Sequence, residues 1–288
     1  MPKKKSTKKN SRASRKRRVA PKTQPVKPVV KKTSPRQVMV IVHGGGDIPQ
    51  DYCKGLVEGI EAQLVRPFDY VAAYYSDVIT QHARGVVALA ESPEEKNFKA
   101  EYEKLLRETH ERNQEDQRKR GIAPMGFLGI DPALADTINE VAQYIFNASA
   151  AAEVQQRLVE TLNQATQDFD TIVLVTHSLG TIVAYDVLKQ FANRYKISSW
   201  FTLGCPLGKL VKTRVREAGL GVISPLTIPQ WYNLYDTNDF VADVIGSFFH
   251  APDFHVYDIF VEVAPSMPAA HDYFLNAETH ALLANAIR

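Results

Sequence analysis

The chain has few cysteines and no long apolar run, and both absences limit what it can be. Only two cysteines, Cys53 and Cys205, occur in 288 residues, and they lie far apart in the sequence. Such a pair cannot form a disulfide framework, and no Cys-x-x-Cys spacing indicates a metal site. No stretch approaches the roughly 18 consecutive apolar residues of a membrane-spanning helix. We therefore expect a cytoplasmic protein in a reducing compartment.

Acidic residues are absent from positions 1–37, which hold 15 of the 35 lysines and arginines. The remaining residues carry 20 basic against 32 acidic side chains, so an acidic body follows a basic arm. The arm also lacks aromatic residues, and its four valines cannot bury enough surface to offset the entropy of ordering. We therefore expect residues 1–37 to be disordered. They contain no apolar segment typical of a secretory signal.

The basic arm allows two interpretations. It either tethers the protein to nucleic acid, an anionic membrane or an acidic partner, or it is a solubilising extension that binds nothing. Without aromatic side chains, contact with nucleic acid would depend on phosphates and would be non-specific. A tether of either kind would place the cytoplasmic protein at the periphery of a membrane or an anionic polymer.

Apolar runs alternate with helical patterns through residues 38–288, which indicates an α/β domain. Strands are predicted at 37–43, 69–75, 171–176, 197–203, 230–235 and 254–263. Helices are predicted at 49–64, 92–120, 133–148, 151–167, 178–194 and 277–287. This alternation favours a mostly parallel central sheet with helices on both faces. The segment 92–150 interrupts the alternation as a helical insertion, which is either a cap or lid over the site or a surface insertion without a role there.

One turn indicates the chemistry. The strand 171–176 leads through His177 into Ser178, and an apolar helix follows at once. A serine at such a turn stands clear of the sheet, as in a nucleophile elbow, although Thr176 replaces the usual glycine of Gly-x-Ser-x-Gly. The alternative is an ordinary strand–helix turn. A serine nucleophile needs a histidine base, a carboxylate that orients the histidine, and backbone donors for the oxyanion.

Backbone donors are predicted at the end of the first strand, where His43 precedes three glycines. Glycines let N–H groups approach a ligand closely, so Gly44 and Gly45, together with the N–H of Leu179, are the candidate oxyanion hole. The alternative is a plain turn or a phosphate loop. A phosphate loop would end in Gly-Lys-Ser/Thr, which is missing.

The orienting acid is expected just after a later strand, where Asp236 and Asp239 compete. Asp236 stands at the strand's edge and could cap the turn. Asp239 lies further along the loop, where a carboxylate can reach across to a histidine, and we favour it. Asp243 is a weaker third candidate.

The base should follow the acid, in the loop after the final strand. His271 occupies that position and is our choice. His250 precedes the final strand, His255 lies at its edge, and His280 lies in the last helix, where a ring is more often packed or solvated. His177 next to the serine is expected to point away from it and to pack or line the pocket.

Together these motifs resemble the α/β-hydrolase superfamily, in its lipase/esterase-like bacterial branch. The matching segments are His43–Gly45, Thr176–Gly180, Gly204–Leu207, Asn233–Val241 and His271–Tyr273. The resemblance covers about residues 37–288, outside the arm and much of 92–150. It implies the α/β-hydrolase fold and a Ser178-Asp239-His271 triad that cleaves a carboxylic ester or related acyl bond of a small molecule or lipid. It also implies no metal and no other cofactor.

Two further hypotheses compete with this one. The chain could be a non-catalytic protein of the same fold that binds a ligand or partner and is anchored by its basic arm. It could also be an enzyme of lipid surfaces whose arm docks on anionic membrane.

Overall fold

The computed structural model describes most of the chain beyond the arm. The described residues are 35–85, 91–119, 121, 132–191, 194–213 and 228–287. They belong to a compact unit that begins at Pro35. The predicted disorder of the basic arm concerns residues that lie outside the described ones, except for its last three.

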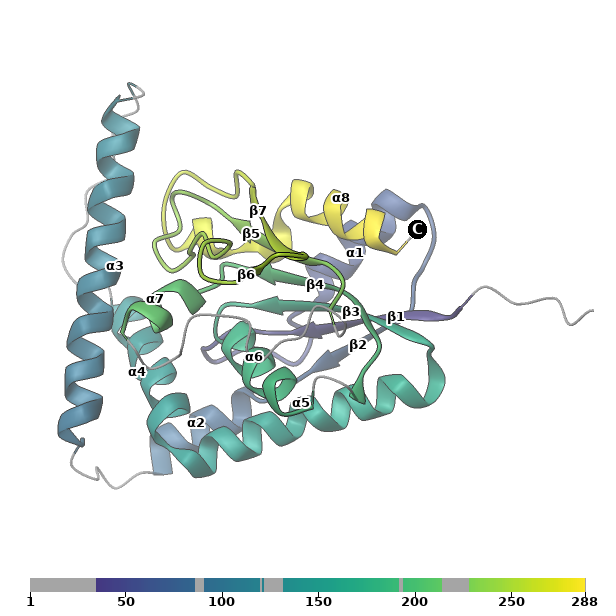
Figure 1. Ribbon diagram of the computed structural model, residues 1–288, viewed down its shortest axis with the longest axis horizontal. Helices are drawn as coiled ribbons and strands as arrows, with labels where there is room; N and C mark the ends of the chain where they lie inside the picture. The colour runs from purple at the N-terminus through teal and green to yellow at the C-terminus, as the bar shows by residue number, and fades with distance from the viewer. Residues whose placement is uncertain are drawn as a thin grey trace, which may run out of the picture. The chain divides into compact units, whose positions relative to one another are not determined.

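The centre of the unit is a seven-stranded sheet with the order β2-β1-β3-β4-β5-β7-β6 (Figure 1). The strands are β1 (Gln37–Val42), β2 (Tyr70–Ala73), β3 (Thr171–His177), β4 (Ile197–Leu203), β5 (Trp231–Tyr235), β6 (His250–Ala251) and β7 (Phe254–Phe260). All neighbouring pairs are parallel except β6 and β7, which are antiparallel. The predicted α/β class with a mostly parallel sheet is confirmed.

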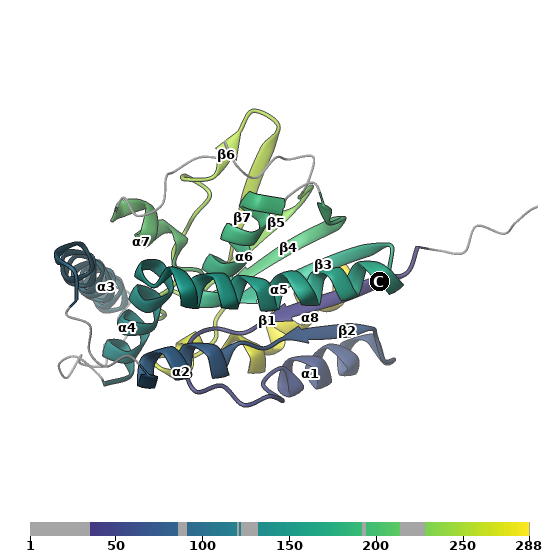
Figure 2. The ribbon, with the colours of Figure 1, turned by 90° about the horizontal axis from the view of Figure 1, so that it is seen from below.

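Helices cover both faces of this sheet, as Figure 2 shows. The helices are α1 (Lys54–Leu64), α2 (Ser76–Gly85), α3 (Pro93–Lys119), α4 (Pro132–Phe146), α5 (Ala148–Asp168), α6 (Leu179–Phe191), α7 (Leu207–Lys212) and α8 (Ala277–Ala286). Helices α1 and α8 pack together on one face, whereas α5 and α6 pack together on the other. Within the described residues, none of the helices is both long and apolar enough to cross a membrane.

The adjacent strands β1 and β3 are almost continuously apolar, and both of their faces are buried. In β1, Val38, Val40 and Val42 join the core beneath α5 and α6, and Met39 and Ile41 join the core beneath α1 and α8. Successive side chains of a strand point to opposite faces, so a strand covered on both sides must be apolar at every position.

Helix α3 stands at the edge of the unit and packs on α4 and α7 (Figure 1). Its sequence is highly charged, and only a narrow stripe that includes Phe98, Tyr102 and Leu106 is buried. The predicted exposed helix at 92–120 is therefore present. The predicted helical insertion consists of α3, α4 and the start of α5, and it lies between β2 and β3 in the chain.

The sequence patterns missed three short elements and misplaced one helix start. Neither α2 nor α7 is predicted, and the two-residue strand β6 lies in a hairpin with β7. Short elements carry too few turns for a clear period, and α7 also contains a glycine. Helix α1 begins at Lys54, five residues after Pro49, because the residues between them form a turn.

Two tryptophans and a threonine hydroxyl bind the middle of the sheet together. The rings of Trp200 and Trp231 on β4 and β5 stack with centroids 4.3 Å apart. The indole N–H of Trp200 donates to Oγ1 of Thr176, 3.0 Å away, and Thr181 on α6 shares that hydroxyl at 3.0 Å. All of these residues are buried. The hydroxyl therefore gives Thr176 a buried hydrogen-bonding role that a glycine at this position could not supply.

We therefore predict that Thr176→Val lowers the free energy of unfolding by about 1–3 kcal/mol, because it leaves the buried indole N–H without an acceptor. Thr176→Ser keeps the hydroxyl and is the matched control. Urea denaturation followed by circular dichroism measures both variants. Equal stability of the valine and serine variants would contradict the role given to the hydroxyl.

Candidate active site

Ser178 forms the sharp turn between β3 and α6. Its φ of 49° lies in the left-handed region, which residues other than glycine seldom adopt. The turn is held by its N–H, which donates to the carbonyl of Leu203 at 2.9 Å. Gly180 allows α6 to start against β1, since a Cβ there would lie 2.2 Å from the carbonyl oxygen of His43. The strained serine and the following glycine are the local geometry expected of a nucleophile elbow.

His271 and Asp239 meet although 32 positions separate them in the sequence. Nδ1 of His271 lies 2.7 Å from Oδ2 of Asp239, whose side chain is fully buried. His271 ends a short 3₁₀ turn, Ala269–His271, after β7. The structure thus brings together the acid and the base that we favoured from the sequence.

Two further donors hold the Asp239 carboxylate. The N–H of Val241 donates to Oδ1 at 2.9 Å, and the hydroxyl of Tyr273 donates to Oδ2 at 3.0 Å. Burial by itself raises the pKa of Asp239, but the His271 ring and these two donors outweigh burial. The pKa of Asp239 therefore lies below its ordinary value, and the group remains a charged acceptor for the His271 ring at neutral pH.

The competing acids make other contacts. Asp236 accepts the N–H groups of Asn238, at 2.8 Å, and of Val263 and Ala264, at 2.8 and 3.1 Å. Asp236 therefore caps the turn after β5, which is the role that its position at the strand's edge suggested. Burial raises the pKa of Asp236. Asp243 is paired with Lys209 at 2.8 Å.

The competing histidines also lie elsewhere. His250 and His255 are exposed and face each other across the β6–β7 hairpin. His280 in α8 packs over Gly59 of α1 and is hydrogen-bonded to the carbonyl of Phe274 at 2.8 Å. Of the two environments expected for the His280 ring, packed or solvated, the structure shows the packed one.

His43 fixes the glycine loop that follows β1. Its Nε2 accepts the N–H of Tyr75 at 3.1 Å, so its proton is on Nδ1, which donates to the carbonyl of Gly44 at 2.6 Å. Burial lowers the pKa of His43 to about 4, so the ring is neutral at pH 7. Gly44 lies against the elbow, where a Cβ would stand 2.9 Å from Cβ of Ser178. Of the predicted oxyanion residues, Gly44 is thus a neighbour of the serine, Leu179 follows the serine in the chain, and Gly45 lies near the Leu179 side chain.

His177 lines the pocket, one of the roles expected for it, and it also supports the base. Its Nε2 lies 2.9 Å from the carbonyl oxygen of His271. Burial, aided by the nearby His271 ring, lowers the pKa of His177 to about 3. The ring is therefore neutral at pH 7, and its Nε2–H donates to the backbone carbonyl of His271.

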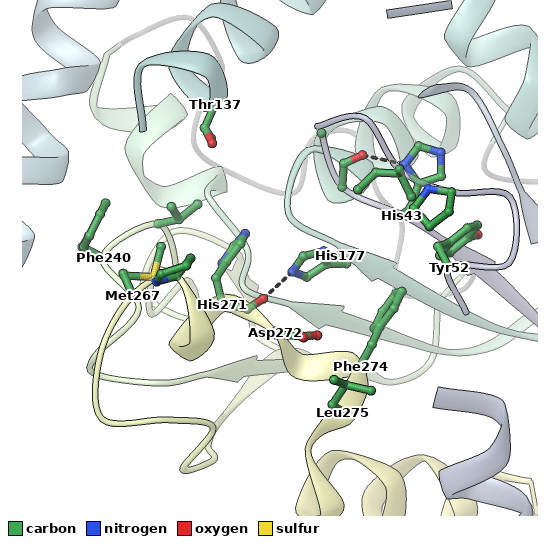
Figure 3. Close-up of a pocket in the computed structure, with 16 residues that line it drawn as sticks. His43, Tyr52, Thr137, His177, Phe240, Met267, His271, Asp272, Phe274 and Leu275 are labelled. Carbon is green, nitrogen blue, oxygen red and sulfur yellow. Dashed lines mark hydrogen bonds between the residues drawn. The ribbon is translucent and has the colours of Figure 1, made fainter. Parts of the chain in front are cut away.

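A cavity of about 480 Å³ opens beside these residues (Figure 3). His177 and His271 stand near its middle, between Thr137, Phe240 and Met267 on one side and Tyr52, Phe274 and Leu275 on the other. Most of the lining is apolar, which suits an apolar ligand.

Ser178 is 5% exposed and is not among the described residues that line the cavity. In the described part of the chain, the His271 ring is hydrogen-bonded to Asp239 and not to Ser178. The Ser178 hydroxyl has no hydrogen-bond partner among these residues.

The helical insertion reaches the site through α4. Thr137 contributes to the cavity wall, and the carboxyl group of Glu140 accepts the N–H of Gly46 in the glycine loop. A Cβ on Gly45 would lie 2.1 Å from Oε2 of Glu140. Burial raises the pKa of Glu140 to about 7, against the lowering effect of the Gly46 hydrogen bond. The described part of α3 does not line the cavity, so the lid hypothesis for 92–150 has support only in α4.

Sequence reasoning missed Glu140 and Tyr273. Glu140 lies in a helix with no motif, and nothing local shows that this helix packs on the glycine loop. Tyr273 follows His271 closely, but only the tertiary structure brings its hydroxyl between Asp236 and Asp239. Among the described residues, no cluster of three or more His, Cys, Asp or Glu side chains could hold a metal ion.

Comparisons of the chain with protein-family models, with curated proteins and with solved structures found no match.

We predict that charging Glu140 destabilises the folded protein. Its pKa rises from about 4.5 to about 7 on folding, so the folded state binds the proton more tightly. Stability from this group is fully present below pH 4.5 and is lost as the pH rises through 7. Glu140→Gln keeps an acceptor for Gly46 without the charge. It should match the wild type near pH 4.5 and exceed it by about 2–3 kcal/mol at pH 8.

Urea denaturation at pH 4.5, 6 and 8 measures this difference. Glu101→Gln, at an exposed site on α3, is the matched control and should show no such dependence on pH. A constant difference between Glu140→Gln and the wild type at every pH would show that the carboxyl group is not perturbed.

Proposed function

We propose that this chain is a serine hydrolase of the α/β-hydrolase fold that cleaves carboxylic ester or related acyl bonds. The observation that carries the proposal is the 2.7 Å contact between His271 and Asp239 beside a serine with a φ of 49°. A buried carboxylate that orients a histidine next to a serine on a strained strand–helix turn is the arrangement that acyl transfer requires. The strand order, with the elbow strand β3 near the centre, is compatible with that fold.

Each group then has a defined role. Ser178 attacks the acyl carbon while His271 takes the hydroxyl proton, and Asp239 stabilises the imidazolium that forms. The N–H groups of Leu179 and of the Gly44–Gly45 loop hold the oxyanion. His271 then gives its proton to the leaving group as the bond between that group and the acyl carbon breaks, which leaves the acyl group on Ser178. Water then attacks this acyl-enzyme while His271 takes its proton, and His271 returns the proton to the Ser178 oxygen as the acyl–serine bond breaks.

The approach of His271 to Ser178 is supported by two neighbours of the serine. A Cβ on Gly204 would lie 2.8 Å from Cε1 of His271, and Gly204 directly follows Leu203, which accepts the Ser178 N–H. His177, on the other side, is bonded to the His271 carbonyl. Hydrogen bonds between nucleophile and base are often long before substrate binds, so the proposed triad is compatible with the lack of a His271–Ser178 hydrogen bond among the described residues.

The apolar walls of the cavity favour a substrate with apolar groups near the scissile bond. Tyr52, Phe274 and Leu275 on one side, and Phe240 and Met267 on the other, offer few polar partners to a charged substrate. A small-molecule or lipid ester fits this lining, and no metal or other cofactor is needed for the reaction that we propose.

A non-catalytic binding protein of the same fold is the second candidate. It is favoured by the surroundings of Ser178, which as a residue is 5% exposed and whose hydroxyl makes no hydrogen bond among the described residues. In that case the apolar cavity would bind a ligand without turnover.

Ser178→Ala distinguishes the two. We expect it to reduce the hydrolysis of p-nitrophenyl butyrate by at least about a thousandfold, because the nucleophile is lost. Labelling of the intact protein by a fluorophosphonate should also disappear. Ser199→Ala removes an equally buried hydroxyl from β4 and is the control, which should keep activity and labelling. If the wild type neither turns over the ester nor reacts with the probe, the binding protein is the better description.

The choice of acid gives a separate prediction. Asp239→Asn should lower kcat by roughly ten-thousandfold, because the amide cannot hold His271 in the tautomer that accepts the serine proton. Asp236→Asn is the matched control, since the Asp236 carboxylate accepts only backbone N–H groups, one in its own turn and two in the segment after β7. It should keep kcat within about tenfold of the wild type. Steady-state kinetics at pH 8 compares them. The reverse order of the two effects would make Asp236 the acid.

A further inference from the structure

A fully buried lysine lies behind the acid loop. Lys209 on α7 is 0% exposed, and its Nζ lies 2.8 Å from Oδ1 of Asp243. Lysine is almost never completely buried, because removing its charge from water is costly unless the charge is paired and hydrogen-bonded. The triad that we propose does not include the Lys209–Asp243 pair, so the burial of this pair needs a separate explanation.

The ammonium group also holds the backbone of the acid loop. It donates to the carbonyls of Val241 and Ala242, each at 3.2 Å, so all three of its donors are used. The N–H of Val241 is the donor to Oδ1 of Asp239. Both backbone groups of Val241 are therefore hydrogen-bonded. Its N–H donates to Asp239, and its carbonyl accepts from the Lys209 ammonium group.

The contact between α7 and the loop is tightly built. Asp243 accepts the backbone N–H of Lys209 at 2.7 Å and donates its own N–H to the carbonyl of Cys205 at 2.8 Å. Gly208 permits this approach, since a Cβ there would lie 2.9 Å from Cβ of Asp243. From β5, the side-chain amide of Asn233 donates to the carbonyl of Asp243 at 2.8 Å. The loop is thus tied to the ends of β4 and β5.

Helix α3 shields this cluster from water. It packs on α7, and Tyr102 is fully buried and close enough to Asp243 and Asp239 to interact with both electrostatically. An ion pair without water around it is stronger and more directional than one at the surface. The pair can therefore act as a rigid clamp on the loop.

We propose that Lys209 is a positioning residue for Asp239, because its ammonium group holds the Val241 and Ala242 carbonyls and thereby aims the Val241 N–H at the triad carboxylate. As a role in catalysis, this inference rests on the proposed hydrolase function. The positioning itself does not depend on turnover, and it is open to measurement in the folded protein.

The decisive variant is the double substitution Lys209→Met/Asp243→Asn. The single Lys209→Met leaves a buried unpaired carboxylate and is expected to be poorly stable. The double variant removes both charges, and asparagine can still accept the Lys209 backbone N–H. It should fold, but the two carbonyls lose their clamp. Lys104→Met/Glu108→Gln removes an exposed pair from α3 and is the matched control.

Two measurements test whether the loss of these hydrogen bonds affects Asp239 and His271. The first is the low-field ¹H resonance of the His271 Nδ1 proton, which reports the hydrogen bond to Asp239. We expect it in the wild type and in the control, absent in Asp239→Asn, and shifted upfield or broadened in the double variant. The second is ester hydrolysis. The double variant should show kcat lowered roughly tenfold with KM within about twofold, and the acid limb of its pH–rate profile displaced.

The outcomes separate the two proposals. A folded double variant with the wild-type resonance, kcat and pH profile overturns the role of Lys209 and leaves the hydrolase proposal intact. A wild type without turnover overturns the hydrolase proposal, whereas the resonance still decides whether Lys209 positions Asp239. A change of the resonance in the Lys104/Glu108 control as well would also count against a specific role for Lys209.

Discussion

The close approach of α6 to the end of β1 is the constraint on which the rest of the site depends. Gly180 makes it possible, because any side chain there would meet the carbonyl of His43. At the same turn Ser178 adopts a left-handed conformation and lies against Gly44. The serine and the start of the glycine loop are therefore neighbours, and the hydrogen bond from the Ser178 N–H to the Leu203 carbonyl holds the strained residue at the end of the sheet.

Two neutral histidines, His43 and His177, position backbone groups near this contact without adding charge. His43 and His177 are both buried, and burial lowers the pKa of each far below 7. Each ring holds a backbone carbonyl, of Gly44 and of His271 respectively. The permanent charge within the proposed triad is then the Asp239 carboxylate, whose donors keep its pKa low. A single oriented charge next to a low-dielectric pocket acts strongly on the nearest ionisable ring.

Support for the proposed acid extends well beyond its contact with His271. Tyr273 joins Asp239 to the backbone of Asp236, and Val241 joins it to the buried pair of Lys209 and Asp243. These contacts come from segments that follow β4, β5 and β7, so the loop is held by the ends of three strands. In a parallel sheet those ends meet at one edge, where polar loops can pack on one another.

The sequence by itself determined the local features of this protein. The apolar runs at 37–43 and 171–176 predicted buried parallel strands, and the serine between a strand and a helix predicted the elbow. These signals are local, since period and turn chemistry depend on neighbours in the chain. Only the tertiary structure separated Asp239 from Asp236, gave Thr176 its partner in Trp200, and placed Glu140 and Lys209 behind the loops. Those outcomes depend on contacts between distant segments, and no local pattern encodes which buried polar groups will meet.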